Sequence, residues 1–187
     1  MEEFASSLAV LVFAFGLAGT AHSQAVPGQC GYDRWPVKTL TDKDSKRVDF
    51  RSVKITVSQL AAIPIHEIPY PDDHRIAPEE FHVYDVRARL VQLRKEQDQD
   101  LHLIIEDLDH PDVRMIAEIP SPACTAGTGY EKKYSKARAI VRSLPPGAEI
   151  ELIGVGFFDF IHDQTGGAKN GIELHPVLGV LALGTRK

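Results

Sequence analysis

Five polar residues near the C-terminal end of the sequence carry side chains that can bind a metal or a ligand. They are His162, Asp163, Asn170, Glu173 and His175. Neutral imidazole and carboxylate groups suit Zn²⁺ or Mn²⁺, and a carboxylate beside such an ion can activate water for hydrolysis. One hypothesis is therefore a metal-dependent hydrolase, such as a phosphodiesterase, that uses a divalent metal. Its candidate ligands are His162, Asp163, Glu173 and His175.

Two other interpretations of these residues stay open, because their spacing matches neither HExxH nor an EF-hand loop. In the first, the cluster is structural: the Asn-Gly dipeptide at Asn170 favours a turn. Glu173 and His175 then pair with Arg114 or Lys169 on a solvated sheet face. In the second, the cluster belongs to a ligand-binding face without catalysis.

Composition and missing motifs exclude several other classes of protein. The sequence is 43% hydrophobic and 25% charged, as in an ordinary globular domain. With 26 acidic residues against 21 Lys and Arg, the formal net charge is −5, which does not favour a protein that grips nucleic acid through phosphates. The sequence contains no GxSxG, GxGxxG or P-loop, so we expect neither a serine nucleophile elbow nor a nucleotide cofactor.

The N-terminal segment is typical of a secretory signal. Residues 8–18 form an uncharged apolar run that is too short to span a bilayer. Ala21 and Ser23 suit the −3 and −1 positions of a cleavage site before Gln24, although Glu2 and Glu3 replace the usual basic residues. We predict a signal peptide over 1–23, a secreted or periplasmic protein, and no membrane span after cleavage.

Cys30 and Cys124 are the two cysteines of the sequence. In an oxidising compartment two thiols usually pair, so export predicts a disulfide between them. The alternative is two free thiols. A disulfide would tie the N-terminal part of the chain to its main body.

The elements that position these groups fall into two regions. Residues 24–80 hold six prolines and many turn formers, and we interpret them as an irregular arm packed on the domain. Within the arm, alternation of apolar residues predicts a short strand over 53–57, and Ser58 is the expected cap of a brief helix over 59–63.

Residues 81–187 form the expected domain. Apolar residues at period two predict strands over 81–93, 101–106, 113–119, 150–160 and 172–180. Between the third and fourth strands, residues 128–144 have an apolar stripe at helical spacing. Thr128 and Glu131 make a candidate capping box for this helix.

This order of elements, β-β-β-α-β-β, with Gly154 and Gly156 bending the fourth strand, resembles the oligonucleotide/oligosaccharide-binding (OB) barrel. The resemblance implies a mainly β, five-stranded closed barrel with strand order 1-2-3-5-4. It also implies a binding surface on the outer face of the second, third and fifth strands, with the loop 161–170 leaning over it. The candidate binding face is His102, Glu106, Arg114, Glu118, His162, Asp163, Asn170, Glu173 and His175.

A second resemblance is at the level of short motifs. The segments are 35–39 (WPVKT), 117–124 (AEIPSPAC), 154–160 (GVGFFDF) and 162–177. Together they look like a family of short exported bacterial proteins. That resemblance implies export and a single domain, and it assigns no catalytic residue.

The working hypothesis is an exported OB-like binding module. Its expected partner is a glycan, a peptide or a small molecule rather than nucleic acid, because basic and aromatic residues do not alternate on the candidate face. A purely structural envelope protein is a further alternative.

Overall fold

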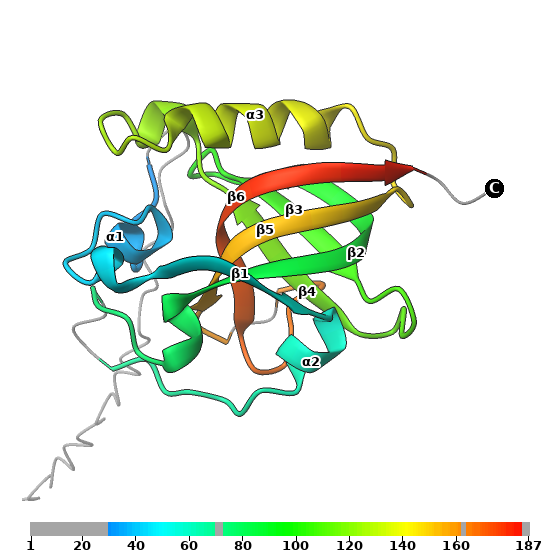
Figure 1. The fold of residues 1–187 in the computed structure, drawn as a ribbon, viewed down its shortest axis with the longest axis horizontal. Coiled ribbons are helices and arrows are strands. Elements are labelled where there is room, and N and C mark those ends of the chain that lie inside the picture. The colour runs from blue at the N-terminus through cyan, green and yellow to red at the C-terminus, as the bar shows by residue number, and fades with distance from the viewer. Residues whose placement is uncertain (1–29, 70–72, 162–163, 185–187) are drawn as a thin grey trace, which may run out of the picture.

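The computed structural model describes residues 30–69, 73–161 and 164–184 (Figure 1). The expected signal peptide lies outside these ranges. The helices are α1 (Trp35–Lys38), α2 (Val57–Ala61) and α3 (Glu131–Arg142), with 3₁₀ turns η1 (Ser45–Arg47), η2 (Pro78–Phe81) and η3 (Pro122–Cys124). The strands are β1 (Asp49–Ile55), β2 (His82–Lys95), β3 (Leu101–Glu106), β4 (Arg114–Ile119), β5 (Glu149–Phe158) and β6 (Ile172–Gly184).

Five strands close into a barrel, as predicted. Their order is β2-β3-β4-β6-β5, and β5 pairs back onto β2 from Val83↔Val155 to Arg89↔Glu149. This is the 1-2-3-5-4 order of an OB barrel, with β2 to β6 as its five strands. The fold class expected from the order of elements is therefore confirmed.

The barrel interior is filled by one side of each strand. Alternation along the strands buries apolar side chains completely or nearly so; examples are Val86, Leu103, Ile105, Met115, Ile119, Ile150, Leu152 and Leu174. The predicted stripe of α3 joins the same core through Tyr134, Ala137 and Val141, and α3 lies along β6 in Figure 1. Burial of each large apolar side chain contributes about 1.5–3 kcal/mol, which makes this interior the main source of stability.

The N-terminal arm adds a sixth strand outside the barrel. β1 runs parallel to β2, with Val53 opposite Tyr84 and Ile55 opposite Val86. The expected strand is therefore present, but it begins at Asp49 and ends at Ile55. Residues of the arm thus form part of the sheet.

Two helix starts differ from their prediction. α2 is capped by Thr56 and not by Ser58: the Thr56 hydroxyl accepts from the Gln59 amide at 3.1 Å, and the Gln59 side chain accepts from the Thr56 amide at 3.0 Å. This is a capping box two residues earlier than expected. The Ser58 amide instead donates to Asp107 at 2.8 Å, which fixes α2 to the turn after β3.

At α3 the expected capping box does not form. The helix begins at Glu131, so this residue is too early to occupy the third helical position that a capping box requires. Its carboxylate accepts from the Gly127 amide at 2.5 Å, while the Thr128 hydroxyl accepts from the Tyr130 amide at 3.2 Å. The two side chains therefore stabilise the loop before α3 rather than its first turn.

A predicted disulfide fastens the arm to the barrel. Cys30 and Cys124 are bonded, with 5.4 Å between their Cα atoms and 94 positions between them in sequence. Cys124 ends η3, directly after β4. The bond therefore holds the first described residue against the segment that joins β4 to α3.

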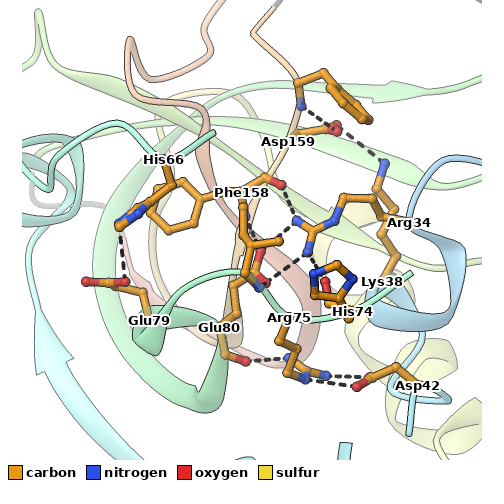
Figure 2. A network of polar contacts seen from close by, with 12 residues as sticks. Arg34, Lys38, Asp42, His66, His74, Arg75, Glu79, Glu80, Phe158 and Asp159 are labelled. Carbon is orange, nitrogen blue, oxygen red and sulfur yellow. Dashed lines mark hydrogen bonds and ion pairs between the residues drawn. The ribbon is translucent and has the colours of Figure 1, made fainter. Parts of the chain in front are cut away.

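A buried ionic network fastens the arm a second time (Figure 2). Arg34 Nη1 lies 2.7 Å from Glu80 Oε1, and its other terminal nitrogen donates to Glu80 Oε2 at 2.9 Å. Arg75 donates to Asp42 at 2.8 Å and also to the Glu80 carbonyl. Glu80 in turn accepts from the Phe158 amide at 2.9 Å, which links the network to β5. All four charged side chains are buried, so this part of the arm packs closely against the barrel.

Gly156 lets the arm approach β5 closely. A Cβ at this position would lie 2.6 Å from the Glu79 carbonyl oxygen of η2 and 2.8 Å from the Tyr84 ring. The glycine that predicted a bend in the strand therefore also makes room for η2. No helix of the described residues is long and apolar enough to cross a membrane.

Candidate functional site

The strand register brings most of the predicted face together. His102 lies opposite Glu118, and Glu106 lies opposite Arg114. Across the next pair of strands, Glu173 lies opposite Ile116. Side chains at these positions point away from the barrel interior, as the period-two argument requires.

This face is covered by the chain itself. His102, Glu118, Glu173 and His175 are 0%, 7%, 4% and 0% exposed. The loop before β6 lies against β3, since a Cβ on Gly166 would be 2.6 Å from the Ile104 side chain. The interpretation of Glu173 and His175 as groups on a solvated face is therefore wrong.

Helix α1 covers another part of the face. Lys38 Nζ lies 3.4 Å from Asp159 Oδ2 and 5.2 Å from the centre of the Phe157 ring. The same ring packs edge-on against the His175 imidazole, with 5.5 Å between the centres. The arm therefore supplies a cation next to the buried acids, which the sequence did not predict.

Glu118 lies at the centre of a buried polar cluster. His102 Nδ1 is 2.8 Å from Glu118 Oε1, and His175 Nδ1 is 3.2 Å from Glu118 Oε2. On its other side, His175 Nε2 is 3.5 Å from Asp100 Oδ2. Asp100 was not among the predicted residues, because it precedes β3 in a polar run that we interpreted as a turn.

The surroundings of the two buried glutamates, Glu118 and Glu173, shift their pKa values in opposite directions. Burial alone would raise the pKa of Glu118, but the hydrogen bond from His102 and the electrostatic interactions with His175 and Lys38 outweigh burial and lower the pKa to about 2. Burial, together with the negative charges of Asp159 and Glu118, holds the pKa of Glu173 well above its usual range. The fold thus favours a charged carboxylate at Glu118 and a neutral carboxyl group at Glu173.

The same cluster also shifts the pKa values of Lys38 and Asp100. Burial opposes the charge on Lys38, but the nearby carboxylates of Asp159 and Glu118 outweigh burial and raise its pKa. Burial raises the pKa of Asp100, and His175 opposes that shift. Lys38 is therefore a fixed positive charge beside the cluster.

A cavity of about 370 Å³ opens beside this cluster. Glu173 forms part of its wall, and the remaining lining comes from the segments on either side of positions 162 and 163. These residues are Asp159, Phe160, Ile161, Gln164, Thr165, Gly167, Ala168, Lys169 and Gly171. The cavity therefore combines apolar, neutral polar and charged groups.

The remaining predicted residues lie apart from this centre. Glu106 pairs with Arg114 at 3.2 Å and with Arg89 at 3.3 Å, at the other end of β3. The Asn170 amide donates to the Leu60 and Ile63 carbonyls at 3.0 and 2.9 Å, so it joins the loop to α2.

His162 and Asp163 lie outside the described residues, so the four-residue metal cluster of the hydrolase hypothesis stays a prediction. A different group of buried residues can hold a metal ion. One donor atom each from Asp100, Glu118 and His175 lie within 4.8 Å of one another.

Comparisons with known proteins do not assign the chain to a family. No family model matches the chain, and no curated protein matches it. Among solved structures, the asparaginyl-tRNA synthetase of Entamoeba histolytica is similar, with a TM-score of 0.42 and 11% identity over 73% of this chain and 24% of that one. OBody AM3L09, solved bound to hen egg-white lysozyme, has a TM-score of 0.39 and 9% identity over 56% of this chain and 84% of its own.

The chain thus spans about a quarter of the synthetase that it resembles. At these TM-scores the likenesses say nothing about function. The assignment of the OB-like barrel rests on the strand order and on the closure between β5 and β2.

Proposed function

We propose that this protein is an exported binding module that holds a short glycan in the cavity beside Glu173. The OB-like barrel is the scaffold, and the loop before β6 together with the end of β5 supplies most of the contacts. The cavity lies within the size range of small-ligand sites.

The buried carboxyl group of Glu173, with one oxygen that lacks a hydrogen-bond partner among the described residues, carries the proposal. Glu173 is 4% exposed, and its Oε2 has no hydrogen-bond partner among the described residues. A buried polar atom without a partner is costly, so a donor or acceptor on a ligand would be a gain. A neutral carboxyl group can both donate and accept, which suits the hydroxyl groups of a sugar.

The rest of the lining fits the same class of ligand. Gln164 and Thr165 offer neutral donors and acceptors, whereas Phe160 and Ile161 offer apolar surface. A sugar ring presents both kinds of surface, with apolar C–H groups and polar hydroxyls. Nucleic acid is disfavoured, because Asp159 lies in the wall and the net charge of the chain is −5.

Export is the second part of the proposal. The disulfide between Cys30 and Cys124 supports an oxidising compartment, and residues 1–23 have the features of a signal peptide. Expression of the full sequence in a bacterial host tests this part. We expect the intact mass of the extracytoplasmic protein to correspond to a chain that begins at Gln24 and contains no free thiol. Recovery of the uncleaved protein from the cytoplasm alone would contradict it.

Calorimetry tests the glycan site. We expect heat of binding with at least one member of a panel of glucose, N-acetylglucosamine and their di- to tetrasaccharides, and none with a single-stranded oligonucleotide. Glu173→Ala should weaken that binding at least tenfold, a loss of about 1.4 kcal/mol.

The matched control is Glu151→Ala. Glu151 lies on β5 and pairs with the exposed Arg87 at 3.2 Å, away from the cavity. Its replacement should leave the affinity unchanged. If no saccharide binds, or if the two variants bind equally well, the cavity beside Glu173 is not a glycan site.

A further inference from the structure

Three buried donors meet where β3, β4 and β6 come together. Asp100 directly precedes β3, Glu118 belongs to β4, and His175 belongs to β6. Asp100 and His175 are both 0% exposed, and Glu118 is 7% exposed. His175 Nδ1 lies 3.2 Å from Glu118 Oε2, and His175 Nε2 lies 3.5 Å from Asp100 Oδ2. One donor atom from each of the three residues lies within 4.8 Å of the other two, which is close enough for the three to share one ion.

Each carboxylate is held by one oxygen and turns the other toward the centre. Asp100 Oδ1 accepts from the Ser121 amide at 2.8 Å, while its Oδ2 has no hydrogen-bond partner among the described residues. Glu118 Oε1 is bound to His102 Nδ1 at 2.8 Å, while its Oε2 faces His175. Anchoring of this kind orients metal ligands in proteins.

The imidazole of His175 is the least satisfied group of the cluster. Both of its ring nitrogens are buried, and neither meets hydrogen-bond geometry with any described residue, although a carboxylate oxygen lies within ion-pair distance of each. Buried ring nitrogens without partners are rare in folded proteins. A ligand between the ring and the carboxylates would satisfy one of them.

The cluster lies where two neighbouring strands of the barrel, β4 and β6, share the fewest paired residues. β4 and β6 are paired only at Ile116↔Glu173 and Ala117↔Leu174, whereas β3 and β4 share six pairs. We propose that Asp100, Glu118 and His175 bind one divalent transition-metal ion that links β4 to β6 and stabilises this short strand pairing.

The donor set selects the kind of ion. One imidazole nitrogen with two carboxylate oxygens suits Zn²⁺, whereas Ca²⁺ takes six to eight oxygens. Three protein donors leave the fourth position of a tetrahedral Zn²⁺ ion to a water molecule, and the burial of all three side chains keeps the ion away from bulk solvent. Glu96, whose side chain is 36% exposed, lies 3.7 Å from His102 at the edge of the cluster.

Metal analysis of the untagged protein tests the site. After EDTA treatment and removal of the chelator, titration with Zn²⁺ should give one bound ion per chain by calorimetry and by elemental analysis. At a hundredfold excess over Kd, Zn²⁺ should raise Tm by about 5 °C or more.

Variants separate this site from adventitious binding. His175→Gln and Asp100→Asn each keep the approximate shape of the side chain and should weaken Zn²⁺ binding at least tenfold. The control Glu106→Gln changes a carboxylate on the same face that pairs with Arg89 and Arg114, and it should bind Zn²⁺ like the unaltered protein.

Two outcomes would overturn the proposal. One is the absence of stoichiometric Zn²⁺ on the unaltered protein. The other is undiminished binding by both variants. If neither variant folds, the visible spectrum of Co²⁺ added to the unaltered protein decides: a spectrum shifted from that of aqueous Co²⁺ supports the site, and an unshifted one refutes it.

Discussion

Glu118 and Glu173 illustrate how neighbouring residues of one type acquire different chemistry. Both are buried on the outer face of the barrel, but Glu118 receives a hydrogen bond from His102 at 2.8 Å. The Oε2 of Glu173 has no such partner among the described residues and faces the negative charge of Asp159. Local donors, rather than burial alone, therefore decide which carboxyl group keeps its proton.

The raised pKa of Glu173 predicts a pH-dependent loss of stability. A carboxyl group whose pKa is higher in the folded state binds more protons there than in the unfolded chain. Stability therefore falls as pH rises from about 4.3, the unfolded value, through the folded pKa, by up to about 1.4 kcal/mol for each pH unit. Glu173→Gln should remove this slope.

Urea unfolding at pH 5 and pH 8 measures the effect. The free energy of unfolding of the unaltered protein should decrease relative to that of Glu173→Gln as pH rises. A constant difference between the two proteins across this range would show that Glu173 is ionised in the fold. Glu118 works in the opposite direction: its contribution is present above about pH 4.3 and is lost as pH falls.

The centre of the site was only partly predictable from sequence. His102, Glu118 and His175 were expected on one face because strand residues alternate, and this requires only the position of each strand. Asp100 precedes its strand, so no alternation marks it. Lys38 reaches the cluster from the arm, whose position depends on tertiary contacts that leave no local pattern.

Among the elements, the buried ion pair between Arg34 and Glu80 decides where the arm lies. Glu80→Ala would leave the buried charge of Arg34 without its carboxylate partner and the amides of Ile76 and Phe158 without their acceptor. We expect a loss of about 3–5 kcal/mol in the free energy of unfolding, measured by urea titration. The control Arg51→Gln removes an exposed pair with Asp49 and should leave the midpoint unchanged. Equal midpoints for both variants would contradict a role of Glu80 in stability.

Gly156 on β5 also determines where the arm lies, because η2 packs directly against it. Gly156→Ala places a Cβ against the Glu79 carbonyl and the Tyr84 ring, so η2 must shift away from the strand. We expect a loss of about 1–3 kcal/mol, as for overpacked sites. Gly179→Ala is the control, because its nearest atom would be the Ile153 Cβ at 3.6 Å, an ordinary contact. Thermal unfolding of both variants should show a lower Tm for Gly156→Ala alone; equally stable variants would mean that η2 does not depend on the glycine.

The strands were more predictable than the segments between them. Period two is strong from His82 to Lys95 and from Leu101 to Glu106, and both strands lie within two residues of their expected ends. The predicted capping residues of α2 and α3 were wrong, because Thr56, Ser58 and Thr128 all have side chains that can cap a helix. Only tertiary contacts, such as that from Ser58 to Asp107, select among them.

For the whole molecule, the disulfide is the covalent link between arm and barrel. In the chain-entropy model, a closed loop of this length contributes about 4–5 kcal/mol to stability. Reduction with dithiothreitol, or Cys30→Ser with Cys124→Ser, should lower the urea midpoint by a corresponding amount. The oxidised protein in the same buffer without reductant is the control. An unchanged midpoint after verified reduction would show that the noncovalent contacts of the arm are sufficient to hold it.

The contacts of the arm also set an order of events during synthesis. Cys30 needs Cys124, Arg34 needs the Phe158 carbonyl, and the backbone of α2 needs Asn170. All of these partners emerge from the ribosome much later than the arm. The arm is synthesised first, but it can pack fully only after β5 and the loop before β6 have been synthesised. A nascent chain that ends before Asn170 therefore lacks some of the contacts that hold the arm.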